Sequence, residues 1–408
     1  MKNHEDEENR ILVFFLGCYF APLWGVGYIL PFLIPFFLFL ISGYFSKSRK
    51  NITLKSFLNA ECFVFLFFLF LVLFSSFYHD ESKWGSTEGF WVTFASFLFF
   101  TFGAAVGIII KPEKLAFYLK LYFFMGFFLL VLTITNFKTF RGGVFDNLND
   151  LTSAVLMLNG AICGIFFTGM DGLKKMAISA LVLPFIGFAF YFSINISSSD
   201  AAVPLLIGLL VFYSILIPSE RSFAVFWSFF LLLICVGVVL LIIGEPLNFK
   251  ALFSVKKLES FLSFRPQGWF ASLSIIRENP WMGIGSGQYK QFYEALLPLL
   301  PGKKLILSHS HSVYFTHFVS HGVAAGLAFI TLLVLNLRLI FSALKDSELV
   351  AFGLMVGGIW FFFLTYGLVE LSPASRELIP LVWGSSGLLV GLRVSKRTGF
   401  SGREGWRL

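Results

Sequence analysis

The chain has 408 residues, of which 57% are hydrophobic and only 13% are charged, and its mean hydropathy is +0.83. A water-soluble domain needs more polar surface than this, so the composition indicates an all-α polytopic membrane protein. The net charge of +8 comes from basic residues scattered between hydrophobic segments. That scatter is typical of membrane topology signals and argues against nucleic acid as a partner.

Hydrophobic segments long enough to cross a bilayer recur along the chain. Residues 11–44 carry no charge over 34 positions, which is about 50 Å as a helix and too long for one crossing. A break near Gly25 and Gly27 therefore predicts a hairpin of two helices. Ten further spans bring the expected total to about twelve transmembrane helices. These ten spans are expected near residues 57–77, 89–110, 115–137, 151–169, 176–196, 201–217, 223–243, 312–342, 348–369 and 378–393.

The short connecting segments alternate in basic content. SKSRK at 46–50 and KPEK at 111–114 are basic-leaning, whereas HDESKWGSTE at 79–88 and SSSD at 197–200 fall on the other side. By the Lys/Arg rule this alternation predicts that both termini are cytoplasmic. Residues 1–244 then hold nine helices, 245–308 form one large periplasmic loop, and 309–408 hold three helices and a cytoplasmic tail. The acidic start MKNHEDEENR argues against a cleaved signal peptide.

Four cysteines lie inside apolar runs without the spacing of a disulfide or metal site. We expect them to be small buried hydrophobic residues. They are Cys18, Cys62, Cys163 and Cys235.

The loop at 245–308 concentrates polar chemistry beside the membrane. It contains eight Lys and Arg residues and four Glu residues, so eight minus four leaves a net charge of +4. Cations close to lipid headgroups attract anionic ligands or lipid phosphate. For any single lysine, an ordinary solvated surface is the alternative interpretation.

Two short helices are predicted inside this loop. Pro266 suits a first helical turn, apolar residues recur at helical spacing from Trp269 to Ile276, and Asn279-Pro280 should end the helix. A second stretch from Tyr289 to Leu297 repeats the pattern up to Pro298. Both are too short to span a bilayer, so we expect them to lie on its outer surface.

Between the two helices stands GIGSG, with Gly283, Gly285 and Gly287. Successive backbone amides in such a loop can form a binding site for an anion. A plain tight turn is the alternative.

Four of the six histidines follow within thirteen positions. His317 and His321 share one helix face, so they fit either two metal ligands or two packed histidines, and the lack of a nearby carboxylate or Cys favours packing. His309 and His311 precede the helix, at the boundary between water and lipid. A neutral imidazole there can accept a proton from a hydroxyl, and we interpret His311 as a general base.

These motifs resemble the O-antigen ligase and O-antigen polymerase superfamily. The resemblance rests on RPQGW from Arg265, NPWMGIGSGQY from Asn279, and HSHS from His309 with Gly322 ten residues beyond Ser312. RGGVFDNLN, from Arg141 to Asn149, is similar to a further segment of that family.

Two positions depart from the family pattern. The chain has Ser198-Ser199-Asp200 where relatives usually carry Ser-Arg, and Ser320 where many carry Glu. We infer that Arg141, in another outer loop, replaces the absent arginine.

The resemblance implies a metal-independent glycan transferase without a cofactor in the bacterial inner membrane, with its active site facing the periplasm. The donor would be a glycan on undecaprenyl diphosphate, and the acceptor lipid A-core or a growing glycan. Arg265 and His311 would act in catalysis. From their positions in the sequence, we further expect Arg141, Arg277, His309 and the three loop glycines to bind substrate, and membrane lipids to contact the protein.

The spacing of His311, Ser312 and Gly322 favours ligation, while repeat-unit polymerisation and a protein acceptor stay open. A membrane transporter is the alternative from another class, because twelve spans are common among transporters. In transporters the ionisable residues usually lie at the membrane midplane, whereas in this chain they gather on one side of the membrane.

Overall fold

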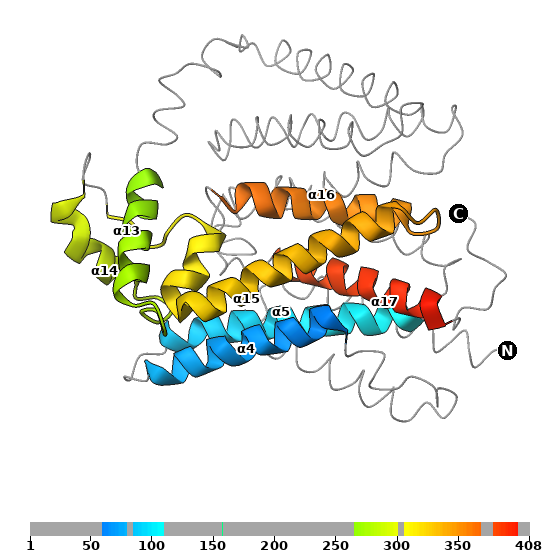
Figure 1. The fold of residues 1–408 in the computed structure, drawn as a ribbon, viewed down its shortest axis with the longest axis horizontal. Coiled ribbons are helices and arrows are strands. Elements are labelled where there is room, and N and C mark those ends of the chain that lie inside the picture. The colour runs from blue at the N-terminus through cyan, green and yellow to red at the C-terminus, as the bar shows by residue number, and fades with distance from the viewer. Residues whose placement is uncertain are drawn as a thin grey trace, which may run out of the picture. The chain divides into compact units, whose positions relative to one another are not determined.

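The computed structural model describes residues 59–79, 85–109, 157, 265–300, 306–368 and 378–398 (Figure 1). These residues form helices and turns and include no strand, in agreement with the predicted all-helical class. The spans predicted within 11–44 and between 115 and 243 lie outside the described residues. Arg141, Asp200 and three of the four cysteines lie outside them as well.

Two described helices are long and apolar enough to cross a membrane, α4 (Ala60–Tyr78) and α15 (Val313–Leu344). Two shorter apolar segments lie within α5 (Gly85–Ile109) and α16 (Val350–Tyr366). All four coincide with predicted spans. The predicted total of about twelve spans stays a prediction.

The chain divides into two compact units. One unit comprises Met1–Asn147, Leu327–Val356 and Pro373–Leu408, and the other comprises Leu148–Gly326 and Gly357–Ser372. Helices α15 and α16 contribute a part to each unit.

In the first unit, α4 and α5 pack with α17 (Ser385–Thr398), which continues from a π-helical turn at Pro380–Gly384. Glycines let α5 and α17 approach closely: a Cβ atom on Gly387 would overlap the Phe100 carbonyl oxygen, and one on Gly391 would overlap that of Ala104. Such contacts between small residues are typical of helix packing in membranes.

Aromatic rings fill the space between these helices. The Phe65 ring centroid lies 5.5 Å from that of Phe100 and 4.7 Å from that of Trp383. The opposite face of α4 leaves Phe63, Phe70 and Phe74 at least half exposed. An apolar outer face suits a helix surrounded by lipid tails.

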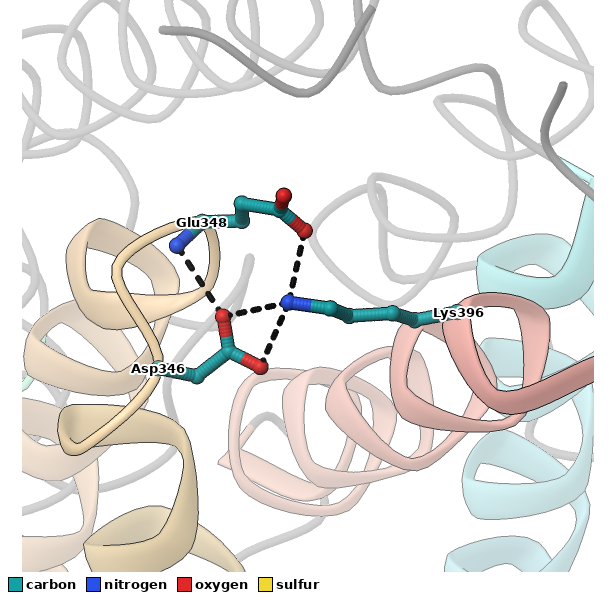
Figure 2. A network of polar contacts seen from close by, with 3 residues as sticks. All are labelled: Asp346, Glu348 and Lys396. Carbon is teal, nitrogen blue, oxygen red and sulfur yellow. Dashed lines mark hydrogen bonds and ion pairs between the residues drawn. The ribbon is translucent and has the colours of Figure 1, made fainter. Parts of the chain in front are cut away.

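An ion network joins the end of α17 to the turn between α15 and α16 (Figure 2). The Lys396 ammonium lies 2.7 and 2.8 Å from the two Asp346 carboxylate oxygens and 2.6 Å from a Glu348 oxygen. The Glu348 N–H donates to Asp346 Oδ1 at 3.0 Å. The last turn of α17 is thereby fixed beside this turn.

The second unit contains the two short helices predicted in the loop, α13 (Arg265–Glu278) and α14 (Tyr289–Leu296), the latter followed by a 3-10 turn at Leu297–Leu299. The inward face of α13 is small and polar, with buried Arg265 and Ser272. Phe270 and Leu273 are more than half exposed on the outer face. A buried cluster joins the two helices to the start of α15: Ala271, Ile275, Ile284, Tyr289, Tyr293, Leu300, Leu307 and Val319.

Candidate active site

A break in α15 shapes the site. Gly322 has φ 84° and ψ 176° in the middle of the helix, so the regular hydrogen bonds stop there. The loop after α13 replaces them: Ile284 N–H donates to the Val319 carbonyl at 2.9 Å, and Gly285 N–H donates to that of Ser320 at 3.0 Å. In return Val323 N–H donates to the Pro280 carbonyl at 2.7 Å. Backbone groups left unpaired at a helix break must find such partners when buried.

Glycine is required on both sides of this contact. Gly283 and Gly322 both have positive φ angles, 67° and 84°. A Cβ atom on Gly322 would overlap the Trp281 carbonyl oxygen, and one on Gly283 would overlap that of Val319. Any other residue would meet both a strained conformation and a collision.

The GIGSG loop, which was predicted as an anion site, uses backbone amides to bond to α15. The amides of Ile284 and Gly285 donate to α15, and the Gly283 amide donates to the Asn279 carbonyl at 3.2 Å. These bonds favour the tight-turn alternative for this part of the loop, because an anion would have to compete with backbone carbonyls for the same hydrogens.

His311 lies two residues before α15 and is the one non-glycine residue with positive φ, 51°, among the described residues. Its neighbours hold the backbone in place. Ser312 N–H donates to Ser310 Oγ at 3.3 Å, and Val313 N–H donates to the Gly367 carbonyl at 2.8 Å. A left-handed conformation is costly for a residue with a side chain, and residues held this way cluster at functional sites.

The structure brings three predicted site residues together. The His309 and His311 ring centroids are 4.1 Å apart, with the rings tilted by 36°. His311 is half-buried, and burial, followed by the positive charge of Arg265, lowers its pKa to about 4. The imidazole is therefore neutral at ambient pH and able to accept a proton.

Arg265 begins α13 and is only 6% exposed. The first turn of this helix lies directly against the segment that carries the histidines: a Cβ atom on Gly268 would be 3.1 Å from Leu307 Cδ1 and 3.5 Å from the Ser310 carbonyl oxygen. A buried guanidinium beside a neutral imidazole suits binding of an anionic group next to a proton acceptor.

Arg277 does not join this group. It lies in the last turn of α13, exposed and about 18 Å along the helix from Arg265. Arg141 lies outside the described residues.

His317 and His321 are buried, and their ring centroids are 6.1 Å apart. His321 Nε2 is 3.4 Å from Ser286 Oγ, which fits the packing alternative. Among the described residues, no set of three or more His, Cys, Asp or Glu side chains gathers around them.

Two buried hydroxyl groups that the sequence did not predict hold the first turn of α13, which begins with Arg265. Tyr289 on α14 donates to the Gly268 carbonyl at 2.8 Å, Ser272 donates to the same oxygen at 2.7 Å, and the two hydroxyl oxygens are 3.3 Å apart. Burial raises the pKa of Tyr289, so its phenol stays protonated and keeps donating. The sequence signal that pointed to Tyr289 was its position two residues after Gly287, the last glycine of the loop.

Tyr289→Phe is expected to lower kcat/KM for glycan transfer about tenfold, chiefly through a higher KM for the donor. Losing a buried hydrogen bond costs about 1–3 kcal/mol and loosens the first turn of α13, which begins with Arg265. Initial rates and thermal unfolding of the purified variant measure both effects.

Tyr293→Phe is the matched control. Tyr293 is fully buried one turn further along α14, and its hydroxyl has no hydrogen-bond partner in the described part of the chain. Removing that hydroxyl should leave KM unchanged and stability equal or higher. Equal losses in the two variants would show that Tyr289 acts only through general packing.

No curated protein sequence matches the chain. The family model described as O-antigen ligase matches residues 185–330, a segment that includes α13, α14, the histidines and the break in α15. Family members are membrane proteins of glycosyltransferase type in lipopolysaccharide biosynthesis. The match confirms the resemblance to the O-antigen ligase and O-antigen polymerase superfamily, and the candidate site lies inside the matching segment.

Proposed function

We propose that the protein transfers a glycan from undecaprenyl diphosphate to a sugar hydroxyl at the outer face of the inner membrane, with lipid A-core as the acceptor. The family match supports glycan transfer in general. The observation that carries the proposal is the pairing of buried Arg265 with His311, whose backbone is strained and whose imidazole is neutral.

The reaction needs one base and one anion-binding group. The acceptor hydroxyl oxygen attacks the anomeric carbon of the donor sugar, and the bond from that carbon to the diphosphate oxygen breaks. His311 accepts the hydroxyl proton. Arg265 stabilises the negative charge that grows on the departing lipid diphosphate, which lowers the barrier because the guanidinium is already in place. His309, whose ring centroid lies 4.1 Å from that of the base, orients it or the acceptor.

Donor binding should also strengthen the base. Arg265 lowers the His311 pKa in the free protein. A bound diphosphate compensates that positive charge and favours the imidazolium, so the pKa of His311 rises towards neutrality. A base with a higher pKa accepts the acceptor proton more readily.

This coupling predicts a pH dependence. His311 must be neutral to accept a proton, so activity falls as the pH decreases through its pKa. The acid limb of kcat/KM, which reports the free enzyme, should lie near pH 4, and that of kcat should lie at higher pH. Steady-state rates across pH in detergent or nanodiscs measure both limbs. A kcat limb at equal or lower pH would contradict the coupling.

The spacing of His311, Ser312 and Gly322 favours ligation over polymerisation. A deletion strain distinguishes the two by its surface polysaccharide. Loss of a ligase leaves long chains on the carrier and none on lipid A-core, whereas loss of a polymerase leaves a single repeat on the core.

Two complemented strains make this test specific to the site. Lys290→Gln, which removes an exposed charge paired loosely with Glu294 at 3.9 Å, should restore the polysaccharide, and His311→Ala should not. Uptake of a lipid-linked glycan into proteoliposomes without transfer would indicate the transporter alternative instead.

A further inference from the structure

Three arginines gather where α15 and α17 end in the first unit. Arg393 and Arg397 lie four residues apart and so share one face of α17, while Arg338 belongs to α15. Arg393 is half-buried, the other two are exposed, and all three interact electrostatically through Arg393. Like charges at such positions repel and destabilise the ends of the helices that carry them.

The neighbouring acidic groups compensate only part of this charge. Lys396, on the same turn of α17, already pairs with both Asp346 and Glu348 (Figure 2). Glu61 and Asp346 are the acidic groups of the described residues that act on Arg393. Counted together, Arg338, Arg393, Arg397 and Lys396 carry four positive charges, and Glu61, Asp346 and Glu348 carry three negative charges, so four minus three leaves one positive charge.

Phosphate is the anion that this group fits. Guanidinium groups are planar and donate pairs of hydrogen bonds to phosphate oxygens, and several of them together hold one phosphate firmly. An exposed pair beside a half-buried third arginine leaves the guanidinium groups open to a ligand.

The position of the cluster identifies the source of the phosphate. α15 is long and apolar enough to span a membrane, and Arg393 directly follows the buried apolar residues Leu388–Leu392 of α17. Charge at the end of apolar helices lies at the depth of lipid headgroups. The predicted topology places this end at the cytoplasmic leaflet, whose acidic lipids attract basic residues.

We propose that Arg338, Arg393 and Arg397 form a binding site for the headgroup phosphate of an acidic phospholipid, which joins the ends of α15 and α17. The bound lipid supplies the negative charge that Glu61, Asp346 and Glu348 together do not. This site is separate from glycan transfer and does not depend on the proposed function.

Thermal unfolding in nanodiscs tests the site. Full-length protein is compared in phosphatidylcholine and in phosphatidylcholine mixed with phosphatidylglycerol. Phosphatidylglycerol should raise the unfolding midpoint by about 2–4 °C, because a ligand that binds only the folded state stabilises it. The double variant Arg393→Gln/Arg397→Gln should lose this rise.

Lys345→Gln is the matched control, because it removes an exposed positive charge near the same helix end but outside the cluster. It should keep the full rise. Arg397→Gln alone, an exposed change that tolerates substitution, should reduce the rise by about half and replaces the double variant if that variant fails to fold.

Three results would overturn the proposal. One is an equal rise in wild type and the arginine variants. Another is a loss in Lys345→Gln as large as in Arg397→Gln, which would indicate nonspecific charge. The third is the same stabilisation from inorganic phosphate in pure phosphatidylcholine, which would make free phosphate the ligand.

Discussion

Arg265→Ala is expected to lower glycan transfer by a factor of about 100–1000 while the protein still inserts and folds. Arg265 is the buried cation of the site, and its charge acts directly on His311. Without it, the negative charge that develops on the departing diphosphate has no guanidinium partner at this position. Transfer of a radiolabelled or fluorescent glycan from the lipid carrier measures the loss.

Arg265→Lys should fail to restore activity. An ammonium group keeps the charge but is a compact point donor, whereas the planar guanidinium binds two diphosphate oxygens at once. Arg277→Ala serves as the matched control, since Arg277 is exposed at the other end of the same helix. It should lose much less activity. Full activity in well-folded Arg265→Ala protein would remove Arg265 from the mechanism.

The short helices of the site could be predicted from local signals. Pro266 and the Asn279-Pro280 pair bracket α13, and the structure has that helix at Arg265–Glu278. Proline acts on the backbone of its immediate neighbours, so its effect is visible in the sequence. The start of α15 just after His311 was predicted in the same way, from a polar segment followed by a long apolar one.

The break in α15 could not be predicted. A single Gly322 in an apolar helix gives no local signal, because glycine is common in membrane helices. The break exists because Ile284, Gly285 and Pro280 bond to it from about 40 positions earlier. These hydrogen bonds depend on the tertiary fold. The only sign of them in the sequence is the spacing of the glycines.

The polar character of the buried face of α13 could not be predicted either. Apolar residues at helical spacing did not tell which face would be buried: Phe270 and Leu273 face outwards, while Arg265 and Ser272 are buried. Where lipid surrounds a protein, hydrophobic periodicity does not separate the outside from the inside, because both are apolar. The hydrogen-bond partners of Tyr289 depend on this arrangement, so the sequence alone does not identify them.

His311→Ala is expected to leave the protein folded and able to bind donor, yet to lower transfer by about a hundredfold or more. The imidazole is the proton acceptor, and alanine offers none. Alanine also has to adopt the φ of 51° found at this position. Histidine already carries this backbone cost of about 1–3 kcal/mol. Alanine adopts the conformation less readily than histidine, so the variant also loses some stability.

Two further substitutions separate the chemical loss from the backbone cost. Asparagine and glycine both tolerate a left-handed backbone, so His311→Asn and His311→Gly should be as stable as wild type or more so. Both should nevertheless be as inactive as His311→Ala, because neither supplies a base.

His309→Ala should lower activity less than His311→Ala does, and His317→Ala should lower the yield of folded protein more than specific activity. Chelators should leave wild-type activity unchanged. If His311→Gly regained activity, the histidine would serve only the backbone. Loss of activity in His317→Ala together with inhibition by chelators would point to a metal at His317 and His321.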